Sequence, residues 1–103
     1  MITEIVTFTL PAGMTREKVQ ANFEKTAPMW GQNPDLLMKY YLYDEEKGVA
    51  GGVYLWREKA HAEKWHGDEF RKRVQDMYGA VPESRFFETP IVIDNLADDE
   101  AGE

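Results

Sequence analysis

Residues 36–56 read LLMKYYLYDEEKGVAGGVYLW, and this stretch decides the fold. Its first eight and last eight residues are rich in aromatic and aliphatic side chains, which favour β-strands. The five residues DEEKG between them are typical of a turn, so the stretch predicts a β-hairpin. The adjacent glycines Gly51 and Gly52 lower the strand propensity of the second arm. They predict a bulge or the close approach of a ligand or of another backbone.

Two helical regions are predicted, one on each side of the hairpin. Thr15 is expected to cap the first helix and Pro28 to end it. The second is expected over residues 58–78, with a break near Gly67 and a C-terminal cap at Gly79. The predicted inward residues recur every three or four positions: Val19, Phe23, Ala27, Trp30, Ala62, Trp65, Phe70, Val74 and Met77.

Two further strands complete the predicted sheet. Residues 2–10 alternate and contain many β-branched side chains, and residues 84–94 supply the last strand. Pro90 cannot donate to a ladder, so this strand is expected at an edge or with a bulge. The order βαββαβ predicts a ferredoxin-like α+β sandwich. We expect one such domain over residues 1–95 and an acidic, disordered tail over residues 96–103.

The composition is that of a small globular protein of 103 residues, 43% hydrophobic and 30% charged. The net charge of −7 argues against nucleic acid or an anionic membrane as partner. The chain has no cysteine, and two histidines are too few for an all-histidine site, so no metal is expected. Neither a signal peptide nor an apolar stretch of the ~20 residues that span a bilayer is visible, which predicts a cytoplasmic protein.

Both faces of the predicted sheet are apolar, although two helices can cover only one of them. Leu36, Met38 and Tyr40 share one face of the first hairpin strand, and Leu37 and Tyr41 share the other. An exposed apolar face usually marks an interface. We therefore expect two copies to pack sheet against sheet as a two-fold homodimer. The alternative is a loop or the C-terminal tail folded over the sheet.

Residues 36–41 (LLMKYY) and residues 50–56 (AGGVYLW) resemble the central hairpin of the YdhR-like putative monooxygenases. These proteins belong with the antibiotic-biosynthesis monooxygenases in the dimeric α+β-barrel superfamily. The resemblance extends over nearly the whole chain in element order, and at residue level over the hairpin and the following helix. It implies a cofactor-independent monooxygenase that acts on a small aromatic or polyketide-like compound in an apolar pocket between sheet and helices.

The resemblance also implies site residues. In quinone-forming members an Asn and a Trp of the third strand and an Arg of the second helical region surround the pocket. The Trp position matches Trp56 and the Arg position matches Arg71. The Asn position falls on Gly52, so another group must supply that contact or the reaction differs. Tyr54 shares a face with Gly52 and Trp56 and could offer its hydroxyl into the space that Gly52 leaves.

The implied oxidation needs neither metal nor flavin, because the anion of an electron-rich phenol or enol reduces oxygen directly. Arg71 would then stabilise the substrate oxyanion, while Trp56 would donate a hydrogen bond and stack on the substrate. Trp30 and Trp65 are expected in the core or the pocket wall, and together with Gly52 and His66 they are the residues expected to bind the substrate. Lys39 is expected either to extend its amine to the rim of the sheet, which is the favoured alternative, or to make a polar contact inside the dimer.

Two alternatives remain at this point. His66 lies at the predicted helix break, where a general base or a haem ligand could sit, although a surface position is expected for it and for His61. The haem-degrading members also have an Asn on the first strand, which residues 2–10 lack. The chain could instead be a non-catalytic dimer that binds a small apolar ligand, since the same fold serves many functions.

Overall fold

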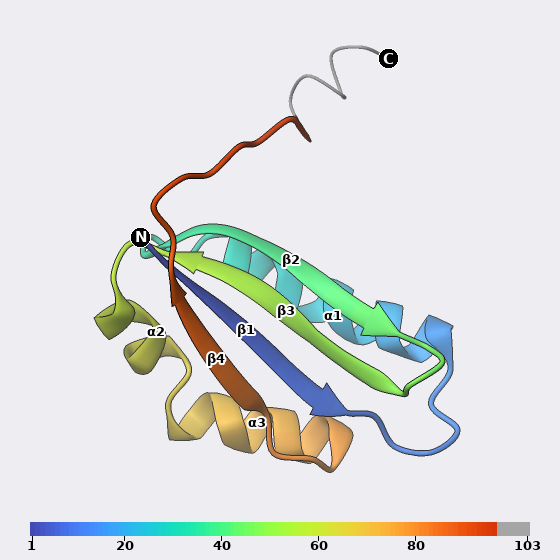
Figure 1. Cartoon of the computed structure of the whole chain (residues 1–103). Helices are drawn as coiled ribbons and strands as arrows, with labels where there is room; N and C mark the ends of the chain where they lie inside the picture. Colours follow the sequence, from blue (N-terminus) through green and yellow to red (C-terminus); the bar gives the residue numbers. More distant parts are fainter. Residues whose placement is uncertain (97–103) are drawn as a thin grey trace.

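A computed structural model of the chain describes residues 1–96 and contains a four-stranded sheet and three helices. The elements are β1 (Ile2–Thr9), α1 (Arg16–Gly31), β2 (Leu36–Asp44), β3 (Val49–Trp56), α2 (Lys59–Trp65), α3 (Asp68–Tyr78) and β4 (Glu83–Glu88). The strand order is β2-β3-β1-β4, and all three pairs are antiparallel. Figure 1 shows α1 behind β2 and β3, with α2 and α3 along the β4 side. The predicted ferredoxin-like α+β sandwich is confirmed, while most of the predicted acidic tail lies outside the described residues.

The helix boundaries follow local signals, with one exception. Thr15 caps α1 by accepting a hydrogen bond from the backbone N–H of Lys18, as predicted. The prediction that Pro28 ends this helix is wrong, because α1 continues to Gly31. A proline so close to the end of a helix removes only one backbone N–H, and the exposed last turn tolerates its loss. Gly79 ends α3 in the left-handed conformation with φ 73°, as predicted.

Most of the predicted inward residues of the helices are buried or, like Phe23 and Met77, half-buried. Ala27 and Trp65 are the exceptions, since both are exposed, and Trp65 is 37% exposed. Trp65 is the last residue of α2, and its indole lies at the surface beside the loop that precedes β2. Trp65 therefore fits the helical spacing of three or four residues, but its position at the end of α2 keeps its side chain outside the core.

The fourth strand is shorter than predicted. β4 ends at Glu88, so Pro90 follows the strand instead of lying within it, and β4 is an edge strand as expected. After β4, residues 89–92 border the open face of the sheet at one end, beside Met38 and Tyr40. Over residues 1–96, no helix has the length and apolar character that crossing a membrane requires.

The glycine pair lies in a continuous ladder, so the predicted bulge in the second arm is absent from β3. A Cβ at Gly51 would collide with the carbonyl oxygen of Val6, which confirms the alternative of close backbone approach. The irregularity lies in β2 instead, between Leu36 and Met38. It turns Leu36 toward the buried core, away from the face that Met38 and Tyr40 share, so the predicted facing of Leu36 is wrong.

The two faces of the sheet differ sharply. The helix-covered face holds the core, which includes Val6, Phe8, Ala50, Tyr54, Trp56, Trp30, Ala62, Phe70, Val74 and Tyr78. Among residues 1–96, Glu4 is the one buried carboxylate, and it is only 1% exposed. On the open face, Tyr40 is 54% exposed. The search for a functional site therefore begins with the charged side chains between the sheet and the helices.

Candidate active site

A small cavity of about 40 Å³ lies between the helix-covered face of the sheet and helices α1 and α3. One buried water needs about 10–15 Å³, so the cavity can hold dioxygen or water but no aromatic ring. Its walls are Val6, Phe8, Phe23, Thr26, Trp30, Lys39, Tyr41, Gly51, Gly52, Tyr54, Phe70, Arg73, Val74, Met77 and Tyr78. Two cations in an otherwise apolar and aromatic lining are the feature that needs an explanation.

Lys39 is the first of these cations. Its Nζ donates a hydrogen bond of 2.9 Å to the hydroxyl of Tyr54. The same Nζ lies 3.9 Å from the ring centre of Tyr41, 4.4 Å from that of Tyr54 and 4.6 Å from that of Trp30. Within residues 1–96 it forms no ion pair with a carboxylate. Burial, with a smaller contribution from the charge of Arg73, lowers the pKa of Lys39 to about 7.

The prediction that Lys39 extends to the rim is therefore wrong. In the β2–β3 register Lys39 lies opposite Tyr54, on the helix-covered face. Gly52 makes room for this arrangement, because a Cβ there would lie 3.2 Å from both Lys39 Cε and Tyr54 Cε1. Burial also raises the pKa of Tyr54, so its hydroxyl keeps its proton. Of the predicted site residues, the structure thus brings Gly52, Tyr54 and Trp30 together around the cavity.

Arg73 is the second cation, and it lines the cavity where Arg71 was expected. Its guanidinium carbon lies 5.6 Å from the ring centre of Phe70. Arg71 is exposed and is not part of the lining. Two residues along a helix differ by about 200° in direction, so both arginines cannot face the sheet. Arg73 follows Phe70 by three positions and was therefore detectable from the helical spacing.

A second polar cluster, formed by Glu4, Trp56 and His66, lies beside the cavity. Glu4 Oε1 accepts a hydrogen bond of 3.0 Å from the indole N–H of Trp56 and lies 2.6 Å from His66 Nδ1. Trp56 is fully buried and does not line the cavity. Its indole N–H donates to Glu4 and is therefore not free to bind a substrate. Sequence reasoning missed Glu4, although it alternates in phase with the buried Val6.

His66 links this cluster to the cavity wall. Its ring centre lies 4.0 Å from that of Phe70, 4.3 Å from that of Tyr54 and 5.3 Å from that of Trp30. Only 4% of its side chain is exposed, so the expected surface position is wrong for this histidine. Burial lowers the pKa of His66, although Glu4 opposes this effect. His66 Nε2 is buried and has no hydrogen-bond partner within the described part of the chain.

Two surface clefts adjoin the cavity. The edge cleft, about 260 Å³, lies between β2 and the end of α1 and shares Trp30, Lys39 and Tyr41 with the cavity. The helix cleft, about 440 Å³, lies between the end of α1 and the α2–α3 junction and contains Trp65. It shares Trp30, Phe70 and Arg73 with the cavity. Lys39 therefore lines both the cavity and the edge cleft, and Arg73 lines both the cavity and the helix cleft. A ligand that enters either cleft from solvent would approach one of the two cations.

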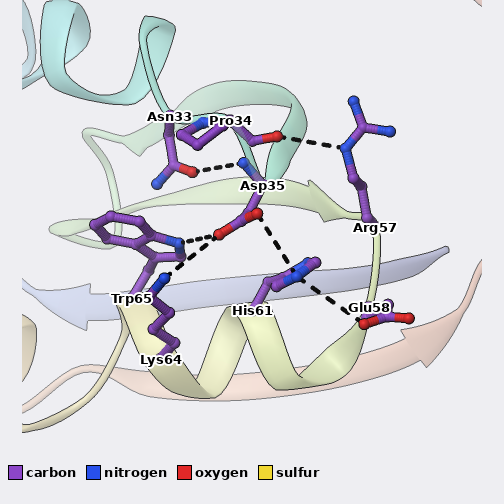
Figure 2. A network of polar contacts seen from close by, with 8 residues as sticks. All are labelled: Asn33, Pro34, Asp35, Arg57, Glu58, His61, Lys64 and Trp65. Carbon is purple, nitrogen blue, oxygen red and sulfur yellow. Dashed lines mark hydrogen bonds and ion pairs between the residues drawn. The ribbon is translucent and has the colours of Figure 1, made fainter.

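Figure 2 shows Asp35 at the centre of a polar network that includes Asn33, Lys64 and Trp65, which line the helix cleft. Its Oδ2 accepts a hydrogen bond of 2.9 Å from the indole N–H of Trp65, and its Oδ1 lies 3.6 Å from His61 Nε2. The hydrogen bond from Trp65 is the main reason why the pKa of Asp35 is lowered. These contacts join the loop before β2 to α2. Trp65 thus serves at the cleft rim, and any contact with a substrate stays a prediction.

Metal-ligating side chains do not converge in this part of the chain. Within residues 1–96, no three or more His, Asp or Glu side chains are grouped as a metal would require. The Glu4–His66 pair contributes two such groups and is occupied with the indole of Trp56. The chemistry that the site offers is therefore that of an amine, a guanidinium and a phenol in an apolar space.

The family described as "Putative mono-oxygenase ydhR" matches residues 5–90. No curated protein matches the chain in sequence. Among solved structures, SnoaB, a cofactor-independent oxygenase from Streptomyces nogalater, is 14% identical with a TM-score of 0.61, covering 89% of this chain and 95% of its own. The ActVA-Orf6 monooxygenase of Streptomyces coelicolor, in complex with nanaomycin D, is 18% identical with a TM-score of 0.65, covering 90% of each chain.

A third similar structure is described as a putative antibiotic biosynthesis monooxygenase from Deinococcus radiodurans. It is 11% identical with a TM-score of 0.68, and the match covers 91% of this chain and 97% of that one. At such low identity these likenesses show the fold alone. The family match extends over most of the chain, including the second part of β1, the hairpin and α3.

Proposed function

Because this chain belongs to the ydhR mono-oxygenase family, we propose that it oxidises a small, electron-rich aromatic or polyketide-like compound with dioxygen and without metal or flavin. One observation carries the proposal. The amine of Lys39 lies in an apolar, aromatic cavity without a carboxylate partner among residues 1–96. The two Streptomyces enzymes of the same fold, a cofactor-independent oxygenase and a monooxygenase that binds nanaomycin D, support this reaction class.

The reaction balances without a further reductant. A substrate methylene beside a phenol or enol loses both hydrogens and gains one oxygen atom as a carbonyl. The second oxygen atom leaves with the two hydrogens as water. The substrate supplies all four electrons, so the protein has to remove a proton, stabilise the anion and exclude water.

We assign the proton transfer to Lys39. With a pKa of about 7 its amine is poised near neutral pH, which suits a general base. The ammonium that it becomes then stabilises the substrate anion together with Arg73, which takes the role expected of Arg71. Tyr54 donates its hydroxyl proton toward the substrate oxygen. The ring of the substrate occupies the edge cleft, and its oxygen extends past Lys39 into the inner cavity, which Tyr54 and Arg73 line. Dioxygen enters the same cavity, because a space of about 40 Å³ has room for a molecule of that size but not for an aromatic ring.

Oxygen uptake with dihydroxynaphthalene- and anthrone-type compounds tests this proposal on metal-free protein. We expect uptake above background, and a loss of at least about 100-fold in Lys39→Met, as removal of a general base predicts. Lys72→Met, on the exposed side of α3, is the matched control and should retain the wild-type rate. Binding of these compounds without uptake would instead indicate a non-catalytic ligand-binding module.

The two arginines provide a second test of the same site. Arg73→Ala should lower the rate, because it removes a cation from the cavity wall. Arg71→Ala should have little effect, because this side chain is exposed. The reverse outcome would restore the assignment that the family resemblance implied and would refute the role given to Arg73.

We also propose that the chain works as a cytoplasmic homodimer that pairs through the open face of the sheet. The apolar residues Met38, Tyr40, Val53 and Leu55 support this pairing, since they lie together on that face beside Ile91. Sedimentation at micromolar concentration should detect two copies, and Tyr40→Glu should shift them to one. Gln20→Glu, an exposed change on α1, is the control. A single copy for the wild-type protein would refute the pairing.

A further inference from the structure

Lys39 places a primary amine at the boundary between the cavity and the edge cleft, because it lines both. A carbonyl group that extends from the edge cleft into the cavity would meet Nζ, Tyr54 and Arg73 there. Leu36, Ala27 and Trp30 contribute apolar side chains to this cleft, which also exposes polar atoms. A general base needs only to exchange a proton there, but a neutral amine in this position is also a nucleophile.

The surroundings of Lys39 match those that activate a lysine as a nucleophile. Such lysines are desolvated in an apolar pocket or lie near another cation, because both conditions favour the neutral amine. Lys39 satisfies both conditions, since aromatic rings surround Nζ and Arg73 lines the same cavity. No ion pair with a carboxylate of residues 1–96 holds its proton in place.

Tyr54 supplies the acid that a condensation at this amine requires. Its hydroxyl lies 2.9 Å from Nζ, close enough to reach the oxygen of a carbonyl group that the amine attacks. Because Tyr54 is buried, its hydroxyl stays protonated and can donate. Arg73 offers a second set of N–H donors in the same cavity for another oxygen of the ligand.

We propose that Lys39 condenses with a ketone group of a small 1,3-dicarbonyl compound that enters through the edge cleft. Nζ attacks the carbonyl carbon, and the electron pair of the C=O bond moves to oxygen, which takes a proton from Tyr54. The resulting carbinolamine loses water, which carries away the oxygen and two protons, and a C=N bond remains. Tyr54 takes back a proton from the nitrogen as the carbinolamine forms, so no phenolate persists, and no oxidant or reductant is needed.

A 1,3-dicarbonyl compound fits the site better than a simple ketone. Its imine rearranges to a conjugated enaminone, whose remaining carbonyl oxygen carries partial negative charge and can accept hydrogen bonds from Arg73. The inference concerns the same cavity as the proposed oxygenation, but it does not depend on oxygen chemistry. It gives Lys39 a covalent role in selecting the ligand.

Pentane-2,4-dione is the probe, used under nitrogen at pH 7 with the intact protein. Mass spectrometry should detect one adduct with the mass of the diketone less one water, and peptide mapping should place it on Lys39. We expect Lys39 to react at least about tenfold faster than the exposed Lys72, because amines in water are almost fully protonated at this pH. Lys39→Arg should abolish the adduct, and Lys72→Arg should retain it.

The far-ultraviolet circular dichroism of Lys39→Arg shows whether this variant is folded, and Tyr54→Phe gives an independent test. Tyr54→Phe should slow the adduct formation while leaving Lys39 in place. Labelling spread over the exposed lysines, with Lys39 unmodified, would overturn the inference. If that result occurs while Lys39→Met still loses oxygen uptake, the covalent role fails and the proposed oxygenation stands.

Discussion

Glu4 and Lys39 are both charged side chains beneath the helices, but the fold treats them in opposite ways. Glu4 is 1% exposed and is bound by the indole of Trp56 and the imidazole of His66. Lys39 has one neutral hydrogen-bond partner, the hydroxyl of Tyr54, and is otherwise surrounded by rings. Removing one partner of a buried, hydrogen-bonded polar cluster is strongly destabilising, whereas a buried charge without an opposite charge costs stability and is typical of a functional site.

The largest difference between the two should appear in the free energy of unfolding. Glu4→Ala leaves Trp56 Nε1 and His66 Nδ1 without their partner and should cost about 3–5 kcal/mol. Lys39→Met replaces an unpaired amine with an apolar chain of similar length and should cost less than about 1 kcal/mol or increase stability. Urea unfolding measures both. The exposed Glu63→Ala is the control and should change stability by no more than about 0.5 kcal/mol.

The pH dependence of folding stability tests the contribution of Lys39 to this comparison. Its pKa is about 7 in the folded chain against 10.5 in an unfolded one, so the unfolded state binds more protons between these values. Stability should therefore rise with pH over this range, by about 2–4 kcal/mol for wild type relative to Lys39→Met. Tyr41, Tyr54 and Arg73 face Lys39 and are common to both proteins, so the difference isolates its titration. A flat difference would contradict the prediction.

Gly52→Ala should have a smaller effect on stability. The new Cβ would lie 3.2 Å from Lys39 Cε and from Tyr54 Cε1, and the flexible lysine chain can move aside. We expect a cost of about 1 kcal/mol, together with slower oxygen uptake because the amine is displaced. Unfolding and uptake are measured on the same preparation. An unchanged rate would show that the position of Nζ is not critical.

The smallest effect on folding stability is expected at acidic pH, from the titration of His66. Burial lowers its pKa below the ordinary 6.5, so the unfolded state takes up a proton before the folded state does. The stability of wild type relative to His66→Phe should therefore decrease as the pH falls below 6.5. Glu4, Lys39 and Arg73 are the charged groups that act on this ring. An increase over that range would mean that Glu4 outweighs burial.

Much of the fold could be predicted because its signals are local. Short stretches of sequence were sufficient to predict four features: the hairpin of residues 36–56, the cap at Thr15, the cap at Gly79 and the break near Gly67. The irregular register of β2 was not, because it depends on pairing with β3. The adjacent glycines led to the prediction of a bulge in β3, although the register shift lies in β2.

The candidate site was predicted less completely, because its contacts join distant parts of the chain. Trp56 was expected to face a substrate, but its N–H is bound by Glu4, which lies 52 positions earlier. No sequence pattern records that pairing. Arg73 and the inward direction of Lys39 could have been found by applying helical and strand periodicity to charged residues as strictly as to apolar ones.

The titration of Lys39 itself is the most direct test of the functional use of an unpartnered charge. Nuclear magnetic resonance of the lysine Cε and Nζ groups follows each amine separately, and Lys39→Met identifies the signal of Lys39 by its loss. We predict a midpoint at about pH 7 for this signal. A midpoint close to 10.5, together with the exposed lysines, would mean that the amine is solvated, and it would contradict the roles given to Lys39.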